Sequence, residues 1–182
     1  MIEIPPGGPE LNKNDHAREA QLRAISIYAK RPELAKGTDR GAAEVREGLS
    51  CTYEQDGHRV SMDMPVAIGG SAKDPTPGFF GRAAICACLA IGIKMTASRE
   101  NMHLDSVRVE IEQDWDNRGV LAIEGTSPVP SDTRIVITVS SQETEDKVSE
   151  AITRALAHDP WYLAFRDAQP VSTTISFSKA VA

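Results

Sequence analysis

Three cysteines, Cys51, Cys86 and Cys88, are the residues of this chain whose chemistry depends most on their surroundings. Cys86 and Cys88 lie two residues apart in a segment that predicts one apolar helix, so their side chains point about 200° apart. They therefore cannot form a disulfide with each other unless the helix unwinds. A helical cysteine is either a small buried residue or, where a cation or a helix N-terminus lowers its pKa, a nucleophile. The residues alone leave both interpretations open for Cys86 and Cys88, whereas Cys51, in a predicted strand, is expected to be a packing residue.

The other polar residues form no pattern that indicates a cofactor or a metal site. The four histidines have no metal-ligand spacing to one another or to a cysteine, so we expect no metal ion and no cofactor. They are His16, His58, His103 and His158. The glycine-rich stretch that contains Gly69, Gly70 and Lys73 lacks the spacing of a phosphate-binding loop. The chain also lacks the Gly-x-Ser-x-Gly motif of many serine hydrolases.

The composition predicts one globular domain. The chain has 182 residues, of which 41% are hydrophobic and 25% are charged, and this is enough for a single core. The formal net charge is -6 and there is no cluster of Lys and Arg, so we expect no nucleic-acid partner. The N-terminus lacks the pattern of a signal peptide, and the longest uncharged apolar run, residues 83–93, is too short to span a bilayer. Together with the three sparse cysteines, these features predict a cytoplasmic protein that does not bind membranes.

The central element is predicted at residues 77–99, the helix that carries two of the cysteines. Thr76 is a suitable N-cap, Pro77 suits the first helical position, and Asn101 suits the C-terminal end. Between residues 83 and 93 the helix is apolar nearly all round, which predicts burial on several sides.

One helix and two strands are predicted before this central helix. The helix spans residues 14–31 and has a thin apolar stripe, so we expect it to cover a surface rather than to build a core. The strands span residues 45–54 and 58–64. Asp56 and Gly57 between them predict a hairpin turn, because both residues tolerate a positive φ.

Strands and one more helix are predicted after the central helix. The strands are expected at residues 107–112, 120–124, 135–139 and 172–178, the last with Ile175 and Phe177 facing inward. Thr144 caps an amphipathic helix, which His158-Asp159-Pro160 ends. Because most strands follow one another through short turns, the sequence predicts an α+β fold with largely antiparallel sheets.

Several segments, by their order and spacing, resemble the OsmC/Ohr family. They are residues 48–58, Gly69-Gly70, Pro75-x-Pro77, residues 83–90, residues 107–111 and the helix end at residues 157–160. The resemblance covers residues 41–178. We therefore interpret residues 1–40 as an N-terminal extension with one helix, and residues 41–182 as an OsmC-like domain.

The resemblance implies a two-layer α+β fold, with antiparallel sheets around a long buried central helix, assembled as an intertwined homodimer. It also implies a thiol-dependent peroxidase that reduces organic hydroperoxides, with an external thiol as reductant. In the family a proline precedes the reactive cysteine by eleven residues, and from Pro77 this position is Cys88. The resemblance therefore assigns Cys88 as the catalytic residue.

Two departures from the family pattern bear on this activity. Asp159 stands at the position of the family's second cysteine, and Gly78 at the position of a glutamate that holds an arginine against the thiolate. Arg46 and Arg59 come from the strand region that supplies this arginine. A carboxylate at position 159 near Cys88 would raise the pKa of the thiol by charge repulsion.

These departures support an alternative function. In this alternative the chain forms a catalytically degenerate OsmC-like dimer that binds a small hydrophobic ligand. The residues expected to line its pocket are Phe79, Phe80, Trp161 and Tyr162.

Overall fold

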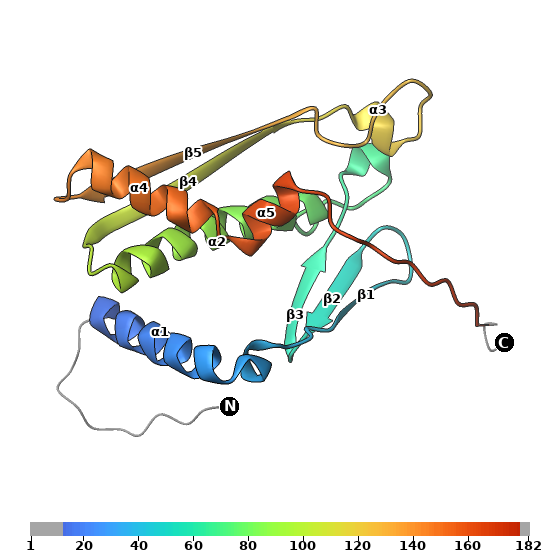
Figure 1. Ribbon diagram of the computed structural model, residues 1–182. Helices are drawn as coiled ribbons and strands as arrows, with labels where there is room; N and C mark the ends of the chain where they lie inside the picture. Colours follow the sequence, from blue (N-terminus) through green and yellow to red (C-terminus); the bar gives the residue numbers. More distant parts are fainter. Residues whose placement is uncertain (1–12, 179–182) are drawn as a thin grey trace.

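The computed structural model describes residues 13–178 (Figure 1). The helices are α1 (Lys13–Lys30), α2 (Pro77–Arg99), α3 (Asn117–Val120), α4 (Glu145–Leu156) and α5 (Pro160–Arg166), with short 3-10 helices η1 (Pro32–Ala35) and η2 (Val66–Ile68). The strands are β1 (Gly41–Val45), β2 (Cys51–Gln55), β3 (His58–Met62), β4 (Leu104–Asp114) and β5 (Asp132–Ser141). They form a three-stranded antiparallel sheet, β1-β2-β3, and a long two-stranded antiparallel ribbon, β4-β5.

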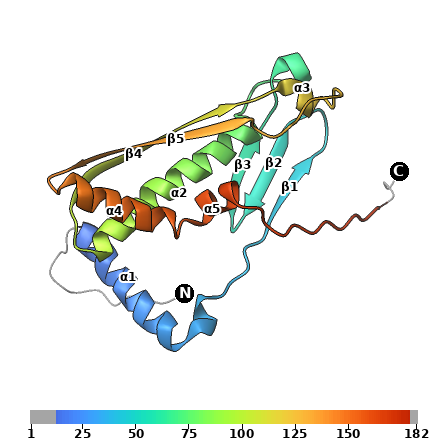
Figure 2. The same cartoon turned by 45° about the horizontal axis from the view of Figure 1, so that its top comes forward.

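The elements are arranged around α2. This helix runs along the β4-β5 ribbon, while α4 and α5 pack on it as well and α1 crosses near its C-terminal end (Figures 1 and 2). The mixture of helices with antiparallel sheets is the class that the sequence predicts. Helix α2 also begins and ends as predicted, because Thr76 is its N-cap, Pro77 is its first residue, and Asn101 beyond its end has a φ of 56°.

One stripe of α2 forms the core. Ile85, Leu89, Ile93 and Ala97 recur every four residues and are buried. The last two pack with Leu104 of β4 and with Ala155 of α4. Each large aliphatic side chain buried in this way stabilises the fold by about 1.5–3 kcal/mol.

The opposite stripe of α2 is exposed, so the prediction of burial on several sides is wrong for the single chain. Ala83, Ala87, Ile91 and Met95 also recur every four residues, and Ile91 is 59% exposed. The elements packed on α2 leave this stripe open to solvent. Within residues 13–178, α2 is the one helix that is long and apolar enough to cross a membrane, a property that core helices share.

The predicted hairpin turn is confirmed, but the strand before it is shorter than predicted. Asp56 and Gly57 have φ values of 50° and 79° and join β2 to β3. The single strand predicted over residues 45–54 is instead two strands. Gly48 has a φ of 63°, and the chain reverses there so that β1 pairs back onto β2 in an antiparallel manner.

Two other predicted strands are absent from the described chain. Val120 ends the short helix α3, and residues 121–124 form turns and irregular structure after it. Asp116 caps α3 by accepting a hydrogen bond from the backbone N–H of Arg118. Residues 172–178 are extended but pair with no described strand, and Phe177 is 95% exposed rather than facing inward. A strand requires an edge to pair with, and the sequence pattern alone does not supply that edge.

The loop that leads into α2 is organised by one buried carboxylate. Asp63 is only 2% exposed, and it accepts hydrogen bonds from the backbone N–H groups of Met64, Ser71 and Lys73 and from the Ser71 hydroxyl. These bonds, the one from the Ser71 hydroxyl most of all, lower the pKa of Asp63. Gly70 is needed in this loop, because a Cβ there would lie 1.8 Å from the carbonyl oxygen of Met64.

We predict that Asp63→Asn lowers the melting temperature at pH 7, because an NH2 group replaces an oxygen that accepts hydrogen bonds. Since the folded-state pKa is lowered, the stabilisation is complete above the unfolded pKa of about 3.9 and is lost as the pH falls through the folded value. The difference from wild type should therefore shrink at about pH 3 or below. Thermal unfolding followed by circular dichroism tests this. Asp56→Asn in the exposed turn is the control, since Asn-Gly also suits a hairpin, and an equal loss in both variants would contradict the role of Asp63.

Candidate functional site

Cys88 lies in the middle of α2 and is half-buried. Cys86 is also half-buried on this helix, and Cys51 lies in β2, so all three thiols are free. Gly92 follows Cys88 by four residues and therefore lies on the same face of the helix, one turn further along.

Asp159 packs against this face of α2. It occupies the junction between α4 and α5 and is 3% exposed. One of its oxygens, Oδ1, caps α5 by accepting a hydrogen bond of 2.8 Å from the backbone N–H of Tyr162. The other, Oδ2, would lie 3.2 Å from a Cβ at Gly92, so the glycine makes room for the carboxylate.

The surroundings of Cys88 raise the pKa of its thiol. Burial is the largest cause, and the nearby Asp159 carboxylate adds to it because it stabilises the protonated thiol and repels the thiolate. The backbone N–H of Trp161 acts in the opposite direction and lowers the pKa. The prediction that Asp159, if near Cys88, raises the thiol pKa is therefore confirmed. Burial alone raises the pKa of Cys86.

The two arginines considered for the thiolate lie elsewhere in the chain. Arg46 pairs with Glu44 at 3.1 Å and Arg59 pairs with Glu54, and both guanidinium groups are largely exposed. No cation from residues 13–178 is among the groups that shift the pKa of Cys88. At the start of α2, a Cβ at Gly78 would lie 3.3 Å from Nη1 of Arg82 on the same helix.

The four aromatic residues expected to line a pocket come from two places. Phe79 and Phe80 in the first turn of α2 contact each other edge to face, with ring centroids 5.3 Å apart. Trp161 and Tyr162 belong to α5, where the guanidinium of Arg166 lies 5.6 Å from the centroid of the Tyr162 ring. Of these four residues, Trp161 lies next to Cys88, because its backbone N–H interacts with the thiol.

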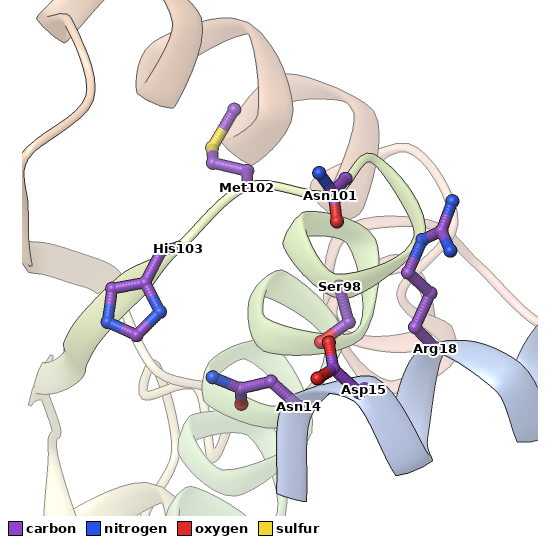
Figure 3. Close-up of a pocket in the computed structure, with 7 residues that line it drawn as sticks. All are labelled: Asn14, Asp15, Arg18, Ser98, Asn101, Met102 and His103. Atoms are coloured by element: carbon purple, nitrogen blue, oxygen red, sulfur yellow. The ribbon is translucent and has the colours of Figure 1, made fainter. Parts of the chain in front are cut away.

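Two cavities were missed by the sequence reasoning. One, of about 360 Å³, lies at the start of α2 and is lined by Arg82, Trp115, Phe165 and neighbouring residues. The other, of about 390 Å³, lies between α1 and the C-terminal end of α2 and is lined mostly by polar residues, among them Arg18, Ser98 and His103 (Figure 3). Ser98 is ten residues beyond Cys88, which places this second cavity roughly 15 Å along the helix from the thiol. Both cavities join segments that are distant in sequence, and no local pattern indicates such contacts.

Comparison with known proteins identifies the family. The OsmC-like protein family matches residues 70–174, which is more than half of the chain, and the chain therefore belongs to this family. A search of curated protein sequences found no match.

Solved structures show the same fold at low sequence identity. The OsmC-like protein from Mycoplasma pneumoniae is 13% identical, with a TM-score of 0.62, and the alignment covers 73% of this chain and 90% of that one. The organic hydroperoxide resistance protein OsmC from Legionella pneumophila is 18% identical, with a TM-score of 0.53, over 71% of this chain and 90% of that one. The family that the sequence resembles is therefore confirmed.

We predict that Asp159→Cys forms a disulfide with Cys88 when the protein is treated with a hydroperoxide, because the side chain at position 159 packs on the same face of α2 as Cys88. Thiol counting should show the loss of two thiols, and peptide mass spectrometry should find the cross-link between α2 and the start of α5. Asp159→Ser, which keeps a helix cap but adds no thiol, is the control. An introduced thiol that stays reduced while Cys88 is oxidised would show that the two side chains do not meet.

Proposed function

We propose that this protein is a thiol-dependent redox protein that reduces organic hydroperoxides through the single cysteine Cys88. The observation that carries the proposal is the position of this thiol, which lies on the central helix of an OsmC-family chain eleven residues after Pro77. The name of the Legionella pneumophila structure, an organic hydroperoxide resistance protein, supports this substrate class.

The reaction that we propose needs one protein thiol and an external reductant. The sulfur of Cys88 attacks the distal oxygen of the hydroperoxide, the O–O bond breaks, and the products are a Cys88 sulfenic acid and, after protonation, an alcohol. One external thiol then condenses with the sulfenic acid to give a mixed disulfide and water. A second external thiol releases Cys88 as a thiol and leaves as a disulfide. Asp159 cannot act as the internal resolving thiol, so both electrons come from outside. We also propose a cytoplasmic location, where such thiols are kept reduced.

The activity depends, in this proposal, on Cys88 alone. We predict that wild type and Cys86→Ser consume cumene hydroperoxide in the presence of excess dithiol, whereas Cys88→Ser falls to the rate of the dithiol without protein. Cys86→Ser is a matched control because it removes a half-buried thiol from the same helix. The measurement is the residual hydroperoxide over time. Equal rates for wild type and Cys88→Ser would rule the proposal out.

The alternative of a catalytically degenerate dimer that binds a small hydrophobic ligand has one observation in its favour. The pKa of Cys88 is raised rather than lowered, which reduces the thiolate at neutral pH. A wild type that does not consume hydroperoxide above background would therefore support the alternative.

We further propose that the protein is a homodimer, with the partner covering the exposed stripe of α2. This stripe, Ala83, Ala87, Ile91 and Met95, is apolar and uncovered along the central helix. A continuous exposed apolar surface of this kind is typical of an interaction site.

We predict that Ile91→Glu weakens the dimer, since it places a charge in the proposed interface. Light scattering after size-exclusion chromatography should then give the monomer mass for Ile91→Glu and the dimer mass for wild type. Val136→Glu is the control, because Val136 in β5 is exposed to nearly the same extent, 57% against 59%, but lies on the ribbon instead of on α2. A wild type with the mass of a monomer, or equal masses for both variants, would contradict the proposed interface.

A further inference from the structure

The carboxylate of Asp159 has an oxygen that no structural role explains. Its Oδ1 caps α5, but Oδ2 is buried and has no hydrogen-bond partner within residues 13–178. Buried polar atoms are nearly always hydrogen-bonded, since leaving one unpaired is unfavourable. The cap alone does not account for this, because an asparagine or a serine would cap the helix as well without a buried charge.

The position of Oδ2 on α2 is made possible by a glycine. A Cβ at Gly92 would lie 3.2 Å from this oxygen, closer than most Cβ contacts. Glycine inside a helix is less favourable than alanine, because the chain loses more conformational freedom. Gly92 and Cys88 share one face of α2, so the room that Gly92 leaves brings the carboxylate next to the thiol.

Several charged and titratable groups on the packed elements have other partners. They are Lys94 on α2, which donates to the carbonyl of Leu104; Arg154 on α4, paired with Glu100; His158, hydrogen-bonded to the carbonyl of Arg154; and Arg166 on α5, paired with Asp167 and placed over the ring of Tyr162. Arg82 of α2 lines the cavity at the start of that helix instead. Among the described residues, Cys88 is the group whose pKa the Asp159 carboxylate shifts, and its thiol is therefore the candidate proton donor for Oδ2.

We propose that Asp159 is the proton acceptor of Cys88, with Oδ2 as the accepting atom. The inference rests on the proposed function, because it concerns the same thiol. As the sulfur attacks the distal oxygen of the hydroperoxide, its proton moves to Oδ2. The O–O bond breaks, the leaving alkoxide takes the proton back from Asp159, and the products are the Cys88 sulfenic acid and an alcohol. No further oxidant or reductant enters this step.

This assignment explains why a carboxylate lies beside Cys88, although its charge disfavours the thiolate. With a raised pKa, the thiol keeps its proton at neutral pH, so a cation-stabilised thiolate is not the reacting species of the single chain. A base in contact with the thiol can instead remove the proton during the attack. Positioned bases of this kind contribute typically about 10²–10⁴-fold to a rate.

The test is the pH dependence of Cys88 alkylation by iodoacetamide, in the full chain with Cys51→Ser and Cys86→Ser so that one thiol remains. Asp159→Asn removes the base but keeps the helix cap, because asparagine caps as well as aspartate. With Asp159 present, we expect the rate to level off between about pH 5 and about pH 7, below the thiol pKa. In Asp159→Asn we expect no plateau, and an alkylation rate roughly 10²-fold lower near the acidic end of this pH range. We also expect the midpoint of the rise in rate, which reports ionisation of the thiol, to shift to lower pH. Parallel profiles in the two proteins would overturn the inference.

Gly92→Ala provides a second variant that keeps the carboxylate. Its Cβ forces Oδ2 to move by a few tenths of an ångström, which disturbs its alignment with the Cys88 thiol. We therefore expect a lower plateau but an unchanged alkylation rate at high pH, where the thiol is fully ionised. An unchanged plateau would count against Oδ2 as the acceptor. The hydroperoxide assay with Cys88→Ser separates the two proposals. If turnover depends on Cys88 but the alkylation profiles are parallel, the role of Asp159 as proton acceptor is refuted and the peroxidase activity is not. If the plateau depends on Asp159 but no hydroperoxide is consumed, the role of Asp159 is supported and the peroxidase activity is refuted.

Discussion

The packing of one stripe of α2 against β4 and α4 is the interaction on which the rest of the structure depends. Ile93 and Ala97 of this stripe form the core with Leu104 and Ala155. This packing fixes the rotation of α2 about its own axis. With that rotation set, Cys88 and Gly92 face the junction of α4 and α5, where Asp159 lies, while the Ile91 stripe faces outward. The core and the candidate site are therefore two consequences of one helix orientation.

The sequence predicted well those features that short segments determine by themselves. The cap and first residue of α2, and the turn at Asp56 and Gly57, depend on the backbone preferences of a few neighbouring residues. The errors concern pairing between distant segments. Residues 172–178 alternate like a strand, but alternation does not say which edge is available, and the described chain supplies none.

The candidate site was predicted in part, and only through the family resemblance. Spacing from Pro77 selected Cys88, and the departure at Asp159 correctly anticipated a higher thiol pKa. Gly92 was not recognised, because a glycine within an apolar helix is indistinguishable in sequence from a packing residue. Its role depends on α5, which reaches α2 only after the chain has passed through β4, β5 and α4.

The three-stranded sheet has a further consequence for the dynamics of the chain. The principal tertiary contacts join α2 to β4, α4, α1 and α5, whereas β1, β2 and β3 chiefly contact one another, and β1 is exposed along its whole length. Small sheets without a covering layer are marginally stable. We therefore expect local opening of this sheet to cost less free energy than opening of α2, and its amide hydrogens to exchange with solvent before those of α2. Cys51 and Cys88 are both half-buried, but Cys51 lies in the middle strand of this sheet and gains further exposure through the same openings, whereas the exposure of Cys88 is set by the packing around α2.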